Sequence, residues 1–410
     1  MPVNIIGSLI IDGPDAIPYY EQITKVLPYA TGIGVVKYLF KGRKNTWERN
    51  LHGKVYIVTG ATSNGMGTSV VLDLAKRGAQ LIMLTRRVDE WTTQFVEDLR
   101  ESTQNELIYL EQCDMSDLYS VRKFATTWLD NTPPRRLDGV VLMHGDAEPW
   151  FQNDKRKSSQ DGVELQLATN FAGPFHLLNL LLPSFRSQPP DRDVRIIYTT
   201  CISQAFGSVN LDDPLLEKKQ LNARQFFGTA KLQMSLCCLE LQRKITSEKK
   251  DDAGSVTVSL VQPGLMRSSS LRTILSNGSP ILLLLLYCII LYPLLWLFVK
   301  NGHQGAQNIL YTLMTPELEK VNLLDYSVKY VVNCTIMKNF ARKEFADQEL
   351  QKKLYEKMES EILGIEKKSA FRRNKAKASG STKEAASTSG TKSANNTSSS
   401  KPAKRKSKKA

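Results

Sequence analysis

Residues 55–67 read Val-Tyr-Ile-Val-Thr-Gly-Ala-Thr-Ser-Asn-Gly-Met-Gly, and this stretch decides the fold. A short apolar run suited to a buried strand leads directly into a glycine-rich turn, and a helical pattern over 67–77 follows. Glycines let a backbone approach a diphosphate closely, and the start of a helix offers unpaired N–H groups and the positive end of its dipole. The stretch therefore predicts a dinucleotide site where a first strand turns into a helix.

Beyond this stretch, apolar runs of strand length alternate with helical patterns. We expect further strands at 79–84, 107–114, 140–143, 194–199 and 256–261, and further helices at 88–103, 117–130, 160–183 and 222–247. Such alternation predicts a parallel sheet with right-handed crossovers and helices on both faces. The fold expected for residues 51–340 is therefore a Rossmann-type, doubly wound α/β domain.

The net charge of +14 is concentrated at the C-terminal end of the chain. Residues 366–410 carry 14 Lys or Arg and 2 Asp or Glu, so the preceding 365 residues are nearly neutral. Small and polar residues dominate this segment, which predicts a disordered polybasic tail after a charged, solvated helix at 341–365. Its partner is expected to be an anionic lipid leaflet, and the lack of interleaved aromatic residues argues against nucleic acid.

Residues 281–299 form a 19-residue apolar run without charge. Its length suits a bilayer, but Arg267 and Arg272 on one side and Lys300 on the other place positive charge at both ends. Pro293 offers a break point within the run. We therefore expect a monotopic or hairpin membrane insertion with both ends cytosolic. The endoplasmic reticulum is the membrane expected by default, since we recognise no other targeting signal in the sequence. A buried helix hairpin or a homo-oligomer contact is the alternative.

Residues 1–50 form an extension before the first strand. Residues 16–40 are moderately apolar, but Glu21, Lys25 and Lys37 interrupt them. This pattern favours either an interfacial helix or an N-terminal helix packed on the body.

The six cysteines and four histidines show no spacing typical of a metal site or a disulfide framework. We expect free thiols in a reducing compartment and no bound metal.

Motifs further along the chain resemble the short-chain dehydrogenase/reductase family, with a C-terminal part similar to its retinol-dehydrogenase-like branch. They are Thr59-Gly60 with Gly65 and Gly67, then Cys113-Asp114, Thr169-Asn170, Pro263-Gly264 and Lys329-Tyr330. The glycine motif carries one extra residue, since Asn64 stands where the family has its second glycine. The resemblance implies a nicotinamide dinucleotide held by Gly60, Thr62, Gly65, Met66, Gly67, Asp114, Lys231, Pro263, Gly264 and Ser268.

Arg86 follows the second expected strand and bears on which nucleotide binds. An acidic residue at this place suits a free ribose 2′-hydroxyl, whereas arginine suits a 2′-phosphate. The sequence therefore favours NADP over NAD.

The resemblance also implies four catalytic groups, of which this chain keeps two. Lys231 and Asn170 match the family, but Phe227 stands in place of the catalytic tyrosine and Cys201 in place of the serine. A phenyl ring has no exchangeable proton, so Phe227 cannot act as a general acid. Other candidate donors are Cys201, Thr200, His144, Tyr198 or a water on Lys231, although strand alternation turns Tyr198 away from Cys201.

Two functions stay open. The first is a membrane-associated NADP-dependent oxidoreductase with an altered proton relay, acting on a hydrophobic, lipid-type alcohol, aldehyde or ketone. The second is a dinucleotide-binding pseudoenzyme that serves as a membrane scaffold or sensor.

Overall fold

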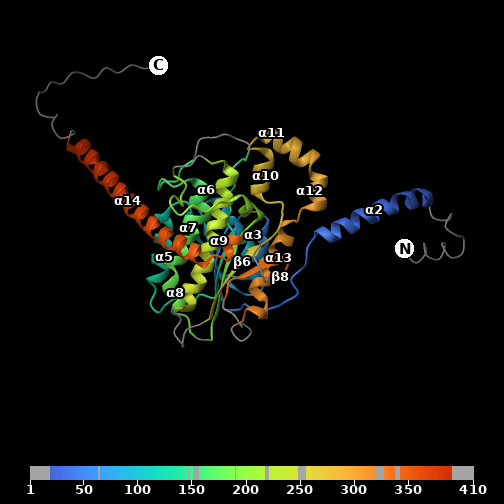
Figure 1. The fold of residues 1–410 in the computed structure, drawn as a ribbon, viewed down its shortest axis with the longest axis horizontal. Helices are drawn as coiled ribbons and strands as arrows, with labels where there is room; N and C mark the ends of the chain where they lie inside the picture. Colours follow the sequence, from blue (N-terminus) through green and yellow to red (C-terminus); the bar gives the residue numbers. More distant parts are fainter. Residues whose placement is uncertain are drawn as a thin grey trace, which may run out of the picture. The chain divides into compact units, whose positions relative to one another are not determined.

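The computed structural model describes residues 19–62, 65–145, 147–150, 157–189, 191–217, 221–247, 255–319, 327–337 and 342–389, with side chains up to residue 374. The chain divides into two compact units, Met1–Ile362 and Leu363–Ala410. Within the described part of the first unit lies one eight-stranded sheet with strand order β3-β2-β1-β4-β5-β6-β7-β8 (Figure 1).

The sheet confirms the expected α/β architecture. Its strands are β1 (Val55–Thr59), β2 (Gln80–Thr85), β3 (Ile108–Gln112), β4 (Gly139–Leu142), β5 (Asp193–Thr199), β6 (Ser255–Gln262), β7 (Lys329–Val332) and β8 (Thr335–Met337). All neighbouring strands run parallel except β7 and β8, which form an antiparallel pair that the sequence analysis did not predict. The strand order reverses between β1 and β4, and ligands of open α/β sheets bind at such a point.

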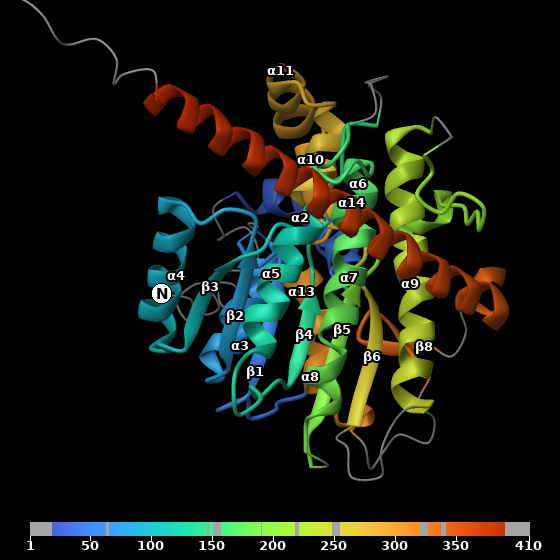
Figure 2. The same ribbon diagram turned by 90° about the vertical axis from the view of Figure 1, so that its left-hand side faces the viewer.

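Helices cover both faces of the sheet. They include α3 (Met66–Lys76), α4 (Glu90–Thr103), α5 (Leu118–Leu129), α7 (Gly173–Leu180), α8 (Leu182–Arg186), α9 (Ala223–Ser247) and α13 (Gly302–Met314). Helices α5, α7 and α9 lie on one face, which Figure 2 turns toward the viewer. Helices α3 and α13 pack on the other face and contribute to one core cluster with β1 and β2. The short helices η3 (Ile202–Phe206), η5 (Pro316–Leu318) and η7 (Lys343–Phe345) connect larger elements.

The helix expected at 160–183 is divided into pieces. Helix α6 (Leu165–Leu167) passes into a widened π-helical segment, η2 (Ala168–Ala172), before α7 begins. This segment carries Asn170, and such wide turns are frequent at functional sites.

Helix α14 (Gln348–Ser389) extends beyond residue 365, where the charged helix was expected to end and the tail to begin. The continuation to Ser389 is rich in Ala and Lys, which favour helix formation. Near its start, Leu354, Met358 and Ile362 recur at helical spacing and are buried. Residues 390–410 lie outside the described residues.

The apolar insertion does not form one continuous helix. It follows α10 (Ser269–Ser276) and is divided among α11 (Pro280–Leu282), η4 (Leu283–Ile290) and α12 (Tyr292–Phe298), with Pro293 in the first turn of α12. Within the described chain no single helix is long and apolar enough to cross a membrane. Residues 269–276 and 280–290 meet the criterion together, but the pair is bent by 108°.

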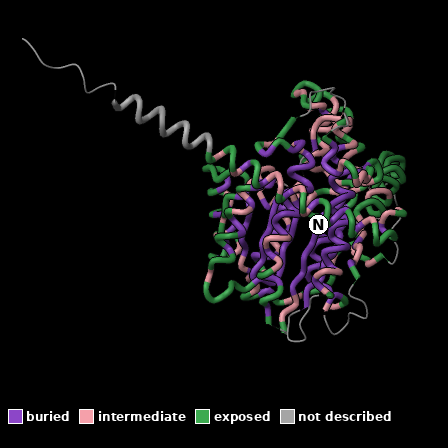
Figure 3. The backbone as a smooth tube through the Cα atoms, turned by 60° about the vertical axis from the view of Figure 1, so that its left-hand side comes forward, coloured by how far each residue is buried: buried purple, intermediate pink, exposed green. Residues whose placement is uncertain are grey.

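Helix α2 (Tyr20–Phe40) contains no buried residue. Figure 3 shows the strands as the buried core of the domain, whereas α2 and the insertion are largely exposed or half-buried.

Candidate functional site

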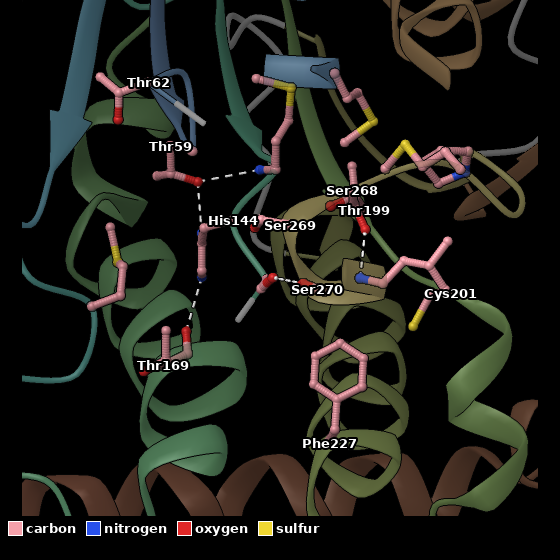
Figure 4. A pocket seen from close by; sticks show the side chains of 18 of the residues that line it. Thr59, Thr62, His144, Thr169, Thr199, Cys201, Phe227, Ser268, Ser269 and Ser270 are labelled. Atoms are coloured by element: carbon pink, nitrogen blue, oxygen red, sulfur yellow. Dashed lines mark hydrogen bonds between the residues drawn. The ribbon is translucent and has the colours of Figure 1, made fainter. Parts of the chain in front are cut away.

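A cavity of about 910 Å³ lies at the carboxyl ends of the central strands (Figure 4). At one end it is lined by the glycine turn after β1 and by the residues that follow β2 and β3. At the other end it reaches Cys201, Phe227 and Lys231. The cavity therefore joins the expected dinucleotide residues to the expected catalytic residues.

The glycine turn is shaped by close backbone contacts. Gly60 has φ +69°, and a Cβ placed on it would lie 2.8 Å from the backbone nitrogen of His144. A Cβ on Gly67 would lie only 2.0 Å from the carbonyl oxygen of Gly60. Glycine is therefore required at both positions, and Thr62 and Met66 line the cavity where helix α3 begins. Without side chains at these two positions, the backbone of the turn can approach a ligand in the cavity closely.

Gly65 contributes to the turn through its backbone. It precedes α3 with φ +124°, and it does not line the cavity. A Cβ placed on Gly302, the first residue of α13, would lie 2.3 Å from the carbonyl carbon of Gly65. The turn is thus supported by the start of a helix more than 200 residues later in the chain. The extra residue inferred at Asn64 lies outside the described residues.

Arg86 and Asp114 lie together at the nucleotide end of the cavity. The Arg86 Nε atom is 3.9 Å from Asp114 Oδ1, and Ser116 donates two hydrogen bonds to the same carboxylate oxygen. The neighbouring Cys113 is buried, and its pKa is raised to about 12 by burial and then by the charges of Asp114 and Asp117. This thiol is therefore protonated at neutral pH and takes no part in ionic chemistry.

Lys231 lies among backbone carbonyl groups and aromatic rings. Its Nζ atom donates hydrogen bonds to the carbonyl oxygens of His144 and Thr199, both at 3.3 Å. The same atom lies 4.9 Å from the ring centre of Tyr198 and 5.8 Å from that of Phe227. Carbonyl dipoles and ring faces both stabilise an ammonium group, so these surroundings suit a cation.

His144 connects three elements around the site. Its Nδ1 atom is 2.7 Å from Thr59 Oγ1, and its Nε2 atom is 2.9 Å from the carbonyl oxygen of Thr169 (Figure 4). Since a carbonyl can only accept, Nε2 carries the proton and Nδ1 accepts from the threonine hydroxyl. Both ring nitrogens are engaged in these contacts, which argues against His144 as a proton donor to a substrate.

Tyr198 and Asn170 meet on the buried side of Lys231. The Tyr198 hydroxyl donates a hydrogen bond of 3.2 Å to the carbonyl oxygen of Asn170, while the Asn170 amide donates to the carbonyl oxygen of Gln166. Neither side chain lines the cavity, although Cys201 does. Burial raises the pKa of Tyr198 well above its ordinary value. Tyr198 is therefore directed away from the cavity, in agreement with the strand alternation.

The turn after β6 and helix α10 form another wall. Pro263, Gly264 and Ser268 line the cavity as expected, and Ser268 caps α10 by accepting from the backbone N–H of Leu271. Ser270, which the sequence analysis missed, donates a 2.7 Å hydrogen bond to the carbonyl oxygen of Gly145. In the sequence, the only indication of this contact is that Ser270 follows the Pro263-Gly264 turn closely.

Further along α10, apolar side chains complete this wall. They belong to Leu271, Ile274 and Leu275. Among the residues that the structure describes, no three His, Cys, Asp or Glu side chains gather in the manner of a metal site.

Comparison with known proteins agrees with this geometry. A family model described as short chain dehydrogenase matches residues 54–208. The chain is 58% identical to an uncharacterized oxidoreductase of Saccharomyces cerevisiae, over 91% of this chain and 95% of that protein. It is 31% identical to human retinol dehydrogenase 14, over 66% of this chain and 77% of that protein. A solved structure of a putative uncharacterized protein from Mycobacterium paratuberculosis superimposes with a TM-score of 0.54 at 19% identity, covering 78% of this chain and 97% of that one.

Proposed function

Because the chain belongs to the short-chain dehydrogenase/reductase family, we propose that it is a membrane-associated, NADP(H)-dependent oxidoreductase acting on a hydrophobic alcohol, aldehyde or ketone. The observation that carries the proposal is the 910 Å³ cavity, which runs from the glycine turn to Lys231 beneath the apolar wall of α10. A cofactor and a substrate of moderate size can lie end to end in such a space.

Arg86 supports NADP(H) as the cofactor. Its guanidinium lines the nucleotide end of the cavity and is more than half exposed, so it is accessible to a 2′-phosphate. A guanidinium binds phosphate through two parallel hydrogen bonds, which a ribose hydroxyl cannot match. Asp114, 3.9 Å from the Arg86 Nε atom, helps to orient this side chain.

The residues at the catalytic end of the cavity have different roles in this proposal. When bound, the nicotinamide supplies or accepts a hydride. Lys231 holds positive charge at this end, where it binds a ribose hydroxyl and stabilises an alkoxide that forms on the substrate. For reduction, the alkoxide takes a proton from Thr200, Cys201 or a water on Lys231, and solvent then reprotonates that donor. Phe227 closes the cavity without contributing a proton.

The apolar wall supports a hydrophobic substrate. Leu271, Ile274 and Leu275 line the cavity from α10, and α10 leads through α11 into the exposed η4. One continuous segment thus forms both the substrate wall and the surface expected to enter a membrane. With this arrangement, lipid-type carbonyl compounds would enter the cavity directly from the bilayer. The proposed location is the cytosolic face of the endoplasmic reticulum.

Oxidation of NADPH by the purified chain, measured with a panel of fatty, retinoid, sterol and polyprenoid carbonyls in detergent, tests the proposal. We expect turnover with at least one carbonyl class and its loss in Lys231→Ala. Phe227→Tyr supplies a phenol beside Lys231 and should raise the rate by roughly 10²–10⁴-fold if proton transfer limits the reaction. Absence of turnover in both the natural chain and Phe227→Tyr, with every carbonyl, contradicts an oxidoreductase function.

The missing phenol supports one second candidate, a dinucleotide-binding pseudoenzyme that serves as a membrane scaffold or sensor. Binding of NADPH without turnover, together with activity gained in Phe227→Tyr, would identify this case.

A further inference from the structure

Two segments far apart in the sequence carry basic residues and no acidic ones. Residues 22–47 contain Lys25, Lys37, Lys41, Arg43 and Lys44, and residues 253–316 contain Arg267, Arg272 and Lys300. Of these, Lys25 is paired with Glu21, which precedes the first segment. Neither segment contains Asp or Glu, although Asp and Glu make up 41 of the 410 residues of the chain. Charge of one sign over such lengths indicates a negatively charged partner.

The structure brings these segments together. The rings of Phe40 in α2 and Phe298 in α12 meet edge to face with centroids 5.0 Å apart. Lys37 lies over the Trp296 ring at 4.9 Å and donates a hydrogen bond to the Trp296 carbonyl oxygen. The C-terminal ends of α2 and α12 therefore pack against each other, and Figure 1 shows them side by side.

Three contacts between a cation and an aromatic ring lie near the packed ends of α2 and α12. Lys37 lies over Trp296, Lys41 lies 4.1 Å from the ring centre of Tyr38, and Arg267 lies 6.0 Å from that of Tyr292. Tryptophan and tyrosine with neighbouring Lys and Arg mark the level of lipid headgroups in membrane proteins. We call these three pairs the aromatic–cationic belt.

The belt lacks a counter-charge among the described residues. The buried Nε atom of Arg267 makes no hydrogen bond to any described residue. The pKa of Lys37 is lowered by burial and then by the positive charge of Arg267. A phosphate or carboxylate group beside the belt would offset this repulsion and could accept a hydrogen bond from Arg267 Nε.

Beyond the belt, many of the exposed side chains are apolar. Val26 in α2 is 61% exposed, and Ile289 and Leu294 in the insertion are 61% and 54% exposed. Further exposed apolar side chains of the two segments belong to Ile23, Leu27, Ile33, Ile281, Leu284, Leu285 and Ile290. Exposed apolar surface on this scale, bordered by cations, has the form of a bilayer-binding region.

We propose that α2 and the α11–α12 segment together form one binding surface for an anionic phospholipid bilayer, with the aromatic–cationic belt at the headgroup level. The inference deepens the membrane association of the proposed function and rests on it. It adds a preference for negative lipid and a role for α2, which the apolar run at 281–299 alone does not provide.

Flotation of the purified full-length chain with vesicles tests the charge preference. The chain should bind phosphatidylcholine vesicles that contain phosphatidylserine more tightly than vesicles of phosphatidylcholine alone. Lys37→Gln and Lys41→Gln should each weaken anionic binding by roughly fivefold, since each basic residue near such a surface contributes attraction. Lys353→Gln, an exposed lysine in α14, is the matched control and should have no effect. Equal binding of all variants, or of both vesicle types, overturns the proposal.

Quenching of Trp296 separates this surface from the basic tail. Lipids brominated in the upper acyl chain should quench the emission that is lost in Trp296→Phe, because only insertion of α12 brings this ring to the headgroup level. Ile289→Asp should abolish the quenching, whereas Leu107→Asp, at an exposed loop position before β3, should not.

The proposal is refuted if brominated lipids leave the Trp296 emission unchanged. It is also refuted if Trp296 is shielded from lipid in a dimer that forms as the protein concentration rises. NADPH oxidation in detergent reports on the proposed catalysis independently of either result.

Discussion

Gly302 lies outside the cavity, yet replacing it should weaken cofactor binding. A Cβ at this position would lie 2.3 Å from the Gly65 carbonyl carbon and 2.4 Å from its Cα. Ordinary contacts of a Cβ begin near 3.4 Å, so the two backbones must separate by about 1 Å in Gly302→Ala. Both contacted atoms belong to the backbone, so no flexible side chain can absorb this shift.

The displaced backbone is the one that precedes α3. Its N–H groups are the expected donors to the cofactor diphosphate, and charge-assisted hydrogen bonds of this kind contribute about 1.5–3 kcal/mol each. Loss of one such bond corresponds to roughly a 10- to 100-fold rise in the dissociation constant for NADPH. Displacements of about 1 Å at catalytic sites have effects of similar size.

Titration calorimetry with NADPH measures this effect. Adenosine 2′-phosphate serves as a second ligand, because it reaches Arg86 but has no diphosphate, and its affinity should change little. Gly364→Ala is the matched control, since a Cβ there meets no atom within 4 Å. An unchanged NADPH affinity in folded Gly302→Ala would refute the reasoning, and so would an equal loss for both ligands.

Three further outcomes are expected. Arg86→Asp should raise the dissociation constant for NADPH by roughly 10- to 100-fold and leave NADH less affected, because it removes the guanidinium and adds repulsion to a 2′-phosphate; parallel titrations with both nucleotides measure this. Lys54 has its pKa lowered to about 8 by burial and then by Arg49, so the unfolded chain binds more protons than the folded chain between pH 8 and about 10.5, and stability rises with pH there. Lys54→Met should abolish this part of the rise in urea unfolding, and a pH profile identical to that of the natural chain would contradict it. Tyr355→Ala should destabilise the first unit by about 3–5 kcal/mol, because it removes a fully buried ring that packs on Phe175, whereas Tyr355→Phe should cost about 1 kcal/mol.

The sequence predicted the six-strand parallel core because periodicity and turn residues there agree with the tertiary fold. The strand from Val55 to Thr59 and the glycine turn are one example, since local pattern and final packing impose the same conformation. The antiparallel pair of β7 and β8 was missed. Its strands have four and three residues, too short for a periodic pattern to appear.

Parts of the site depend on contacts that no local pattern encodes. The support of Gly65 by Gly302 joins residues that are distant in the chain, and a glycine at the start of a helix gives no signal of such a contact. His144 appeared as a candidate acid because histidine is a common proton donor in enzymes, but its two hydrogen-bond partners become visible only in the folded structure. Phe227 and Lys231, by contrast, were identified through the family resemblance, whose motif has its two residues four apart on one helix.

Helix α14 has a consequence for how copies of this chain can meet. Its buried Tyr355 packs edge to face on Phe175 of α7 at 4.9 Å and donates a hydrogen bond to Asn179, and Glu359 pairs with Lys244 of α9. Helix α14 therefore already covers part of the outer surface of α7 and α9. A second molecule approaching these helices would have to displace residues 348–362 first, so self-association through this face competes directly with the native fold.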